Sequence, residues 1–278
     1  MKIYFYAKSG HAIGLESTKK CAAIYNLLKK FDPLLCTSDF RAGAFAKEHL
    51  GVKKYVNIDV IRNLTNIMEK NDILLYSSDE VTLEMKNGMK DFCSLVYSID
   101  EDLGDIIVDK NLYSKNENPK LEKTLFFGDD DYNNELLTLS KDSPLYEINL
   151  LIGHYFFLGN EKILKNSFSN VIDEEEYVDT IKNSKFLLTA SLQTALESLS
   201  CGNNPVIFKR KDKIYNEELI LKLNIPIIDF ENLNDLIEKF ESIIKDYPNI
   251  KDIETDNCEN IINEINEKIS LYNKLMNI

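Results

Sequence analysis

One segment of the chain combines hydroxyl groups, a helix start and a carboxylate in a pattern that suits anion binding. Residues 186–208 form an apolar run, a turn rich in Ser and Thr, a short helical pattern and a second apolar run. Thr189, Ser191 and Thr194 lie where this helix would begin, and the free N–H groups of a helix N-terminus attract phosphate. Glu197 follows on the same helix, where its carboxylate could accept two hydrogen bonds from a ribose diol. The residues alone equally allow Ser191 to be a plain helix cap and Glu197 to be solvated.

Three histidines are the candidate proton-transfer groups. His11 follows Ser9 and Gly10 in a loop that we expect after the first strand. Imidazole exchanges a proton near neutral pH, so His11 is the candidate general base, although it could instead cap the next helix. His49 ends a helical run and is expected at the surface. His154 ends an apolar run and could equally be a loop residue or a phosphate contact.

Two short charged runs follow apolar runs. Asp129, Asp130 and Asp131 form the first, and three carboxylates there could hold Mg²⁺. A helical pattern starts soon after them, so we expect helix capping instead of metal binding, and no metal or other cofactor. The basic run Lys209–Lys213 is interpreted as a solvated loop that could meet a phosphate.

Charge and cysteine usage limit the classes of protein. The 278 residues include 33 Lys and Arg against 46 Asp and Glu, a net charge of −13, which excludes a general nucleic-acid binder. The five cysteines are scattered without a CxxC pair, as is typical of free thiols in a reducing compartment. No run approaches the roughly 20 apolar residues that span a bilayer. We therefore expect a soluble cytoplasmic protein without a membrane span.

Short apolar runs alternate with helical patterns along the chain, which is typical of parallel sheets covered by helices. The expected strands of the first half are Lys2–Tyr6, Leu34–Cys36, Tyr55–Ile58, Ile73–Tyr76 and Ser94–Ser98, with a shorter sixth run at Ile106–Val108. Those of the second half are Thr124–Phe127, Ile148–Ile152, Asn170–Ile172, Phe186–Thr189, Pro205–Phe208 and Ile225–Asp229. One amphipathic helix after the first strand is indicated by the spacing of Cys21, Ile24, Leu27, Leu28 and Phe31.

The pattern restarts after a polar stretch, which predicts two domains. An N-terminal α/β lobe is expected at 1–112, a linker at 113–122 and a C-terminal α/β lobe at 123–250. A long helical pattern predicts a C-terminal helix over 251–278. Ligands of such folds bind at the carboxyl ends of the strands, so the cleft between the lobes is the expected site.

The spacing of Glu197, Gly202 and Pro205 resembles the donor-nucleotide motif of GT-B fold proteins, with one extra residue between Gly and Pro. Within that superfamily the chain most resembles the UDP-sugar hydrolase family of pseudaminic-acid biosynthesis, which acts on UDP-2,4-diacetamido-2,4,6-trideoxy-altropyranose. The resemblance extends over roughly residues 1–230. Its other matching segments are Ala7–Lys20, Ser98–Val108 and Phe126–Asp131.

The resemblance implies a fold and two sets of contacts. The fold would be two Rossmann-like lobes with parallel sheets in GT-B arrangement plus the C-terminal helix, with the acceptor in lobe 1–112 and the nucleotide in lobe 123–250. The implied nucleotide contacts are Gly128, Asp131, Thr189, Ser191, Gln193, Thr194 and Glu197. The implied substrate contacts are Ser9, Gly10, Gly14, Ser17 and Asp100. GT-B proteins generally work without a bound metal, and none is implied here.

The chain departs from the family at two positions. Aligned through Ile13 and Gly14, the family's catalytic histidine falls on Ser17, and a serine without a base partner does not take a proton from water near neutral pH. Asp129 replaces a glycine whose backbone could approach phosphate. His11 lies on the same loop as Ser17, at a point where glycosyltransferases of the superfamily often place a Gly-His pair.

Together these features favour a glycosyltransferase-like enzyme with His11 as base. It would cleave the anomeric C–O bond of a UDP-activated deoxy-acetamido sugar in surface-glycan or flagellin-glycan biosynthesis. One alternative is a UDP-sugar hydrolase acting on water, and another is an inactive relative that binds a nucleotide sugar or a protein partner. A CMP-sugar is an alternative donor. No nucleic-acid or membrane partner is expected.

Overall fold

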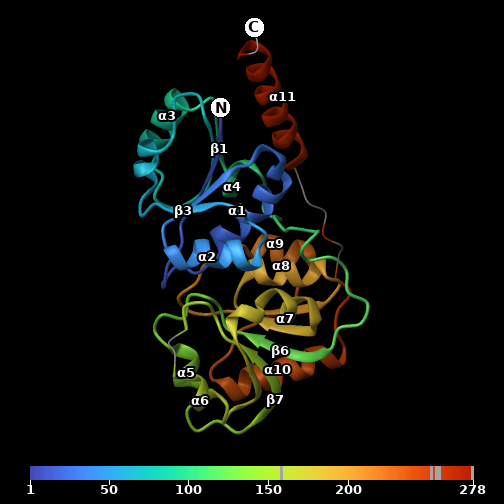
Figure 1. Cartoon of the computed structure of the whole chain (residues 1–278). Helices are drawn as coiled ribbons and strands as arrows, with labels where there is room; N and C mark the ends of the chain where they lie inside the picture. Colours follow the sequence, from blue (N-terminus) through green and yellow to red (C-terminus); the bar gives the residue numbers. More distant parts are fainter. Residues whose placement is uncertain (157–158, 251–252, 254–257, 277–278) are drawn as a thin grey trace. The chain divides into compact units, whose positions relative to one another are not determined.

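The chain forms two compact units, each described here by itself (Figure 1). The structure is a computed structural model that describes residues 1–156, 159–250, 253 and 258–276. Unit 1 comprises Met1–Gly10, Leu15–Asp109 and Glu254–Ile278, and unit 2 comprises His11–Gly14 and Lys110–Ile253. The loop His11–Gly14 therefore belongs to unit 2, although it lies close to the N-terminus of the chain.

Unit 1 contains a five-stranded parallel sheet of order β3-β2-β1-β4-β5. The chain order reverses between β1 and β4, the kind of position where open α/β sheets bind ligands. The strands are β1 (Ile3–Ala7), β2 (Leu34–Thr37), β3 (Tyr55–Asn57), β4 (Ile73–Ser77) and β5 (Leu95–Ser98). The helical elements are α1 (Glu16–Leu27), η1 (Lys29–Phe31), α2 (Phe40–His49), η2 (Ile61–Asn66), α3 (Leu83–Phe92), α4 (Ile99–Asp102) and α11 (Cys258–Met276).

Unit 2 contains a six-stranded parallel sheet of order β11-β10-β9-β6-β7-β8, which reverses between β6 and β9. The strands are β6 (Leu121–Phe126), β7 (Tyr146–Leu151), β8 (Phe168–Ile172), β9 (Ser184–Thr189), β10 (Asn204–Phe208) and β11 (Ile227–Ile228). The helical elements are α5 (Glu135–Leu139), α6 (Glu161–Leu164), η3 (Glu174–Glu176), α7 (Tyr177–Asn183), α8 (Leu192–Ser200), α9 (Glu217–Leu223) and α10 (Leu233–Lys245).

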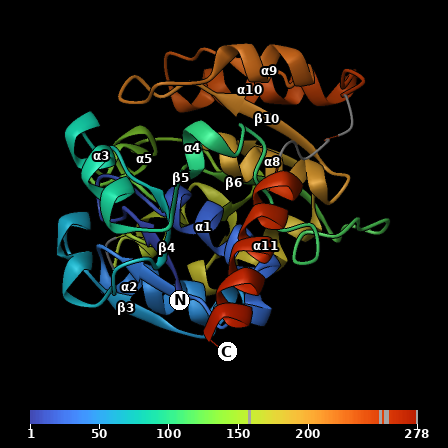
Figure 2. The ribbon, with the colours of Figure 1, turned by 90° about the horizontal axis from the view of Figure 1, so that it is seen from above.

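The central strands are buried along almost their whole length, as expected for parallel sheets covered on both faces. All five residues of β1 are buried. In unit 2, Phe208 of β10 and Ile228 of β11 share a core with Leu236 and Phe240 of α10, which lies beside β10 in Figure 2. Because both faces of these strands are buried, the strands appear in the sequence as continuous apolar runs and not as alternating apolar and polar residues.

Most of the predicted secondary structure is confirmed, with three differences. The eleven principal apolar runs all form strands in the described residues, but Ile106–Val108 does not. Its side chains are buried in a loop after α4, so the apolar run reflects core packing without strand pairing. Leu27, the last residue of α1, is 49% exposed, whereas Ile24 and Leu28 are buried. Helix α11 begins at Cys258, and the first part of the predicted helix lies mostly outside the described residues.

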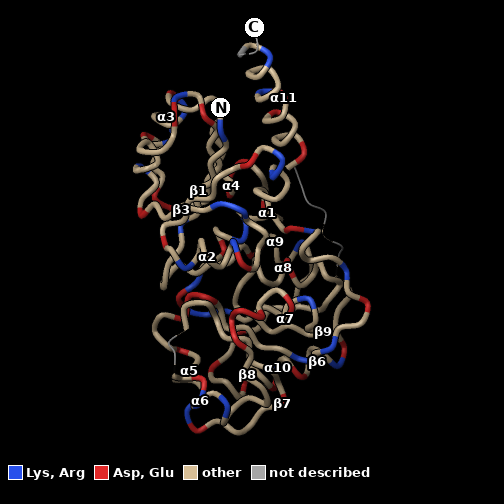
Figure 3. The backbone as a smooth tube through the Cα atoms, viewed as in Figure 1, with Lys and Arg blue, Asp and Glu red and all other residues tan. Residues whose placement is uncertain are grey.

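Asp and Glu residues are spread along the chain in both units (Figure 3). The run Glu174–Glu176 forms η3 just before α7, where negative charge favours the helix dipole. No helix within the described ranges is both long and apolar enough to cross a membrane.

The five cysteines are free thiols with buried side chains. Burial raises the pKa of Cys36 and Cys201 to about 12 and that of Cys93 to about 11, from an ordinary value of 9.0. Since thiolate is the reactive form, we expect the native protein to react with iodoacetamide at least roughly 100-fold more slowly than the unfolded protein. Mass spectrometry before and after addition of guanidinium chloride measures this, and rapid labelling of native Cys36 or Cys201 would contradict it.

Candidate functional site

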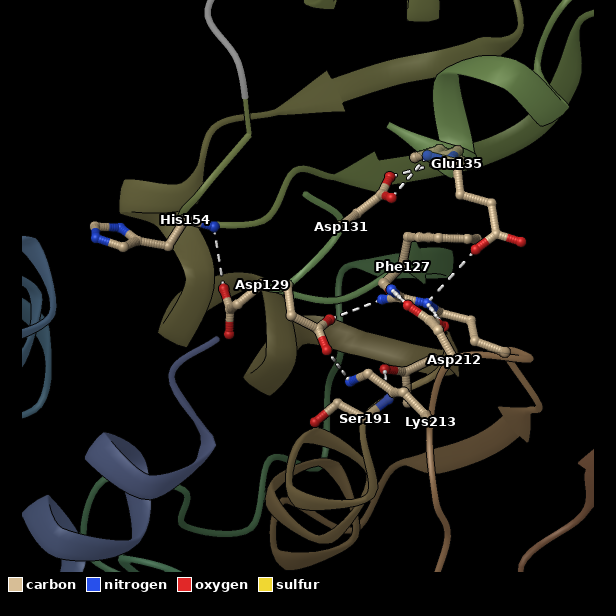
Figure 4. A network of polar contacts seen from close by, with 12 residues as sticks. Phe127, Asp129, Asp131, Glu135, His154, Ser191, Asp212 and Lys213 are labelled. Atoms are coloured by element: carbon tan, nitrogen blue, oxygen red, sulfur yellow. Dashed lines mark hydrogen bonds and ion pairs between the residues drawn. The ribbon is translucent and has the colours of Figure 1, made fainter. Parts of the chain in front are cut away.

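All the predicted nucleotide contacts lie at the carboxyl end of β9 or in the segments that follow β6 and β9, and β10 is the next strand of the same sheet. The loop after β6 contains Gly128–Asp131, the turn after β9 leads through Ser191 into α8, and the loop after β10 contains Arg210 and Lys213. Figure 4 shows polar side chains of these loops turned toward one another. Because the chain order reverses between β6 and β9, this edge is where sheets of this type bind ligands.

The first and third aspartates after β6 have different partners. Asp129 Oδ1 accepts a hydrogen bond from the backbone N–H of His154 at 3.0 Å. Asp131 accepts from the backbone N–H groups of Glu135 at 2.7 Å and Leu136 at 3.1 Å, so it caps α5. Burial raises the pKa of Asp131 above its ordinary value in spite of these two bonds. Within the described part of the chain, no group of three or more His, Cys, Asp and Glu side chains could hold a metal ion.

Asp130 belongs to an ion-pair network around Arg210. Arg210 Nη1 donates to Asp130 Oδ1 at 2.7 Å, and Lys213 Nζ lies 2.9 Å from Asp130 Oδ2. Asp212 accepts hydrogen bonds from Nε of Arg210, at 3.0 Å, and from Nη2. Burial raises the pKa of Asp212, but the hydrogen bond and charge of Arg210 outweigh it, so this pKa lies below its ordinary value. The solvated-loop interpretation of Lys209–Lys213 is wrong for Arg210, whose side chain is only 1% exposed.

Two glycines let the loops of this edge pack closely. A Cβ on Gly153 would lie 2.1 Å from the backbone oxygen of Gly128 and 2.9 Å from Cα of Asp129. Gly128 itself has φ +131°, and a Cβ there would lie 2.7 Å from Asp130 Oδ1 and 3.1 Å from Arg210 Nη1. The backbone of the β6 loop therefore approaches both the β7 loop and the ion pair without a side chain in between.

Helix α8 begins at the predicted position. Ser191 Oγ accepts a hydrogen bond from the backbone N–H of Thr194 at 3.2 Å, which caps the helix. The backbone N–H of Ser191 in turn donates to Thr189 Oγ1 at 3.1 Å. The first turn of α8 contains no acidic residue, so the positive end of its dipole meets no carboxylate from its own first turn.

Glu197 lies in the interior of unit 2. It is 1% exposed, its Oε2 accepts from Tyr177 Oη at 2.6 Å, and its Oε1 accepts from Gln193 Nε2 at 3.2 Å. The Tyr177 hydroxyl also lies 2.8 Å from Thr194 Oγ1. Burial, and then the charge of Glu197, raise the pKa of Tyr177 well above its ordinary value. The alternative of a solvated Glu197 is therefore wrong.

Replacing Tyr177 by Phe is expected to destabilise unit 2 by about 1–3 kcal/mol. The change removes the donor that lies 2.6 Å from Glu197 and leaves a buried carboxylate with fewer partners. Thermal unfolding followed by circular dichroism measures the effect. The matched control is Tyr132→Phe, which removes a hydroxyl from a side chain that is 52% exposed. Equal stability of the two variants would contradict the assigned role of Tyr177.

Both histidines that follow strands contact the same tyrosine. The ring centroid of His11 lies 5.0 Å from that of Tyr155 and 6.0 Å from that of Tyr132. The ring of His154 lies 5.0 Å from Tyr155 in an edge-on arrangement. Because the backbone of His154 is bonded to Asp129, this row of rings borders the β6 loop.

The predicted residues around His11 divide between the units. Ser9 is in unit 1, where its backbone N–H donates to Ser38 Oγ at 2.8 Å and its backbone oxygen accepts from the same hydroxyl. Gly10 follows it there, and a Cβ on Gly10 would meet nothing within 4 Å. Gly14 is in unit 2, where its Cβ would lie 3.3 Å from Cβ of Asp129.

A chain of hydrogen bonds in unit 1 joins Ser17 to Asp100. Ser77 Oγ, at the end of β4, lies 2.9 Å from Ser17 Oγ and 2.6 Å from Asp100 Oδ2. A hydroxyl has one proton, so Ser77 donates to the carboxylate and accepts from Ser17. Lys20 Nζ pairs with Asp100 Oδ1 at 2.7 Å. Ser17 and Asp100, both predicted substrate contacts, therefore lie together at the β1–β4 reversal of the sheet.

Sequence reasoning missed Ser77 and Tyr177 and undervalued Arg210. Ser77 ends a correctly predicted strand, and Arg210 follows another, so position at a strand end was the available signal. No such signal marks Tyr177 in the sequence, because its contact with Glu197 depends on how α7 packs against α8.

No family model and no curated protein matches the chain. Among solved structures, UDP-GlcNAc 2-epimerase from Methanocaldococcus jannaschii in complex with UDP-GlcNAc and UDP has a TM-score of 0.57 at 12% identity, over 96% of this chain and 100% of that chain. A second structure of that enzyme has a TM-score of 0.51 at the same identity and coverage. E. coli heptosyltransferase WaaC with ADP-2-deoxy-2-fluoro heptose has a TM-score of 0.49 at 12% identity, over 89% of this chain and 100% of that chain. The likeness concerns the fold: two Rossmann-like α/β lobes with parallel sheets, plus a C-terminal helix, are confirmed.

Proposed function

We propose that this chain is a nucleotide-sugar enzyme that breaks the bond between the anomeric carbon and the diphosphate of a UDP-activated sugar. The observation that carries the proposal is the meeting of three strand-end loops around the start of α8, at the reversal of the unit 2 sheet. The fold of the epimerase that binds UDP-GlcNAc and UDP supports it. Unit 2 would bind the nucleotide, and unit 1 would bind the acceptor.

Nucleotide binding is assigned to α8 and the β6 loop. The diphosphate lies at the N-terminus of α8, near Ser191 and the backbone of Gly128, where the helix dipole favours negative charge. Asp131 acts indirectly, by capping α5 and so fixing the β6 loop. For Glu197 to accept the ribose diol, Gln193 and Tyr177, which now donate to its two carboxylate oxygens and bury it, must both turn aside.

Proton transfer is assigned to His11, and binding of the acceptor is assigned to unit 1. His11 takes the proton of an acceptor hydroxyl while the oxygen of that hydroxyl forms a bond to the anomeric carbon. The C–O bond between the anomeric carbon and the diphosphate breaks, and UDP leaves with the electron pair of that bond while the α8 dipole stabilises its charge. The linked hydroxyls and carboxylate of Ser17, Ser77 and Asp100 suit a hydroxyl-rich acceptor. With Ser17 in place of the family's histidine, transfer to a sugar is favoured over transfer to water.

Nuclear magnetic resonance of the protein mixed with UDP-GlcNAc and with a panel of UDP-acetamido sugars and CMP-sugars tests the reaction. Release of UDP only when a sugar acceptor is added is the expected result. Release of UDP in water alone would identify a UDP-sugar hydrolase of the pseudaminic-acid pathway type. Release of CMP would show that the donor is a CMP-sugar and not a UDP-sugar. Binding of a nucleotide sugar without bond cleavage would contradict the proposal of an enzyme and would favour the alternative of an inactive relative that binds a nucleotide sugar.

A further inference from the structure

Two cations of unit 2 converge on a single carboxylate. Arg210 Nη1 lies 2.7 Å from Asp130 Oδ1, and Lys213 Nζ lies 2.9 Å from Asp130 Oδ2. Each carboxylate oxygen therefore faces one cation. Two oxygens of a phosphate group can occupy the same two positions, because arginine and lysine bind both kinds of oxyanion.

Arg210 is fixed from its other side. Asp212 accepts hydrogen bonds from Nε and Nη2, and the guanidinium carbon lies 5.0 Å from the centroid of the Phe127 ring. With these groups engaged, Nη1 is the nitrogen directed at Asp130. Nη1 also lies 3.5 Å from the backbone oxygen of Phe127. The bonds to Asp212 and Phe127 hold the guanidinium on the sides away from Asp130, so an incoming anion meets a donor that is already in place.

Asp130 is the exchangeable member of the network. Its side chain is 12% exposed and that of Lys213 is 16% exposed, against 1% for Arg210. Gly128 leaves the space next to the pair without a side chain, since its Cβ would lie 2.7 Å from Asp130 Oδ1. An anion from solvent can thus replace Asp130 while Arg210 stays buried.

The position of the pair matches the proposed diphosphate. Asp130 follows β6, Ser191 follows β9, and Arg210 and Lys213 follow β10, which are adjacent strands of one parallel sheet. Figure 4 draws Lys213 and Ser191 among the side chains at this edge of the sheet. Without a ligand, the buried Arg210 and the partly buried Lys213 need a counter-charge at this position, because an unpaired buried charge is costly. Asp130 supplies it.

We propose that Arg210 and Lys213 form an anion-binding site for the diphosphate of the nucleotide, and that the Asp130 carboxylate occupies this site until the ligand displaces it. The identity of the anion rests on the proposed function. The internal carboxylate lowers the apparent affinity, because only the fraction of molecules with Asp130 displaced can bind.

The test is calorimetric titration of the full chain with pyrophosphate and with UDP, using uridine as the uncharged control. Asp130→Asn is expected to bind pyrophosphate and UDP roughly 10-fold more tightly or better, as removal of a competing state predicts. Lys213→Gln is expected to bind both at least roughly 10-fold more weakly. The matched control is Glu135→Gln, which removes one charge 3.9 Å from Arg210 Nε without vacating the site, and it should change affinity less than roughly 2-fold.

Several outcomes separate this inference from the proposed function. Tight UDP binding by the native protein that Asp130→Asn leaves unchanged or weakens would overturn the anion site while the nucleotide proposal stands. An equal gain in affinity in the Glu135→Gln variant would also overturn the anion site, since the gain would then follow from the change in overall charge. Pyrophosphate binding that follows the expected order without any UDP binding would support the anion site and contradict the nucleotide proposal. Circular dichroism confirms that each variant is folded.

Discussion

Replacing His11 by Ala is expected to lower the turnover of the UDP-sugar substrate by roughly 10²–10⁴-fold while leaving the affinity for UDP unchanged. His11 is the proposed general base, and its ring lies against Tyr155, beside the β6 loop that borders the proposed diphosphate position. Loss of a base slows proton transfer in the transition state without removing a nucleotide contact, so kcat falls and Kd does not.

Two controls distinguish a base from a structural side chain. His49→Ala removes a histidine at the end of α2, where its ring lies 4.9 Å from that of Phe45, and should leave turnover unchanged. Added imidazole should restore part of the turnover of the His11→Ala variant, which a packing role does not predict. Full turnover in that variant would show that another group takes the proton.

Replacing Gly153 by Ala is expected to give the largest loss of stability. A Cβ there would lie 2.1 Å from the backbone oxygen of Gly128 and 2.9 Å from Cα of Asp129, and backbone atoms cannot rotate away as a flexible side chain can. Overpacking of this kind costs about 1–3 kcal/mol, and more where backbone must move. The midpoint of thermal unfolding should fall by roughly 2–4 °C for each kcal/mol.

The same substitution should also weaken UDP binding, because Gly128 and Asp129 lie in the β6 loop that lines the proposed diphosphate position. Thermal unfolding and calorimetric titration measure the two effects. The control is Gly88→Ala in α3, where an added Cβ meets nothing within 4 Å and stability should be unchanged or slightly higher. A Gly153→Ala variant as stable as the native chain would contradict the close contact of the two loops.

The strands and their parallel arrangement could be predicted from the sequence because each strand is a local apolar run between helical patterns. Ile106–Val108 shows where this signal fails, since burial alone produces the same run without strand pairing. The N-terminus of α8 was also predictable, because a Ser cap and the helix it starts are within a few residues of each other.

The partners of the site residues could not be predicted in this way. Arg210 pairs with Asp130 across 80 residues of sequence, and Ser77 joins Ser17 across 60. Such contacts depend on which strands become neighbours in the sheet. Glu197 was predicted as a ligand contact from its position on a helix, but its burial under Tyr177 follows from the packing of α7 on α8. Local patterns identify strand ends, whereas the chemistry at those ends depends on topology.

Calorimetric titration of the purified protein with UDP, with CMP and GDP as controls, tests the central claim most directly. Binding of UDP with a micromolar Kd, and weaker binding of CMP and GDP, is the result that a UDP site in unit 2 predicts. Absence of binding by all three nucleotides would contradict a nucleotide-sugar enzyme and leave only the fold.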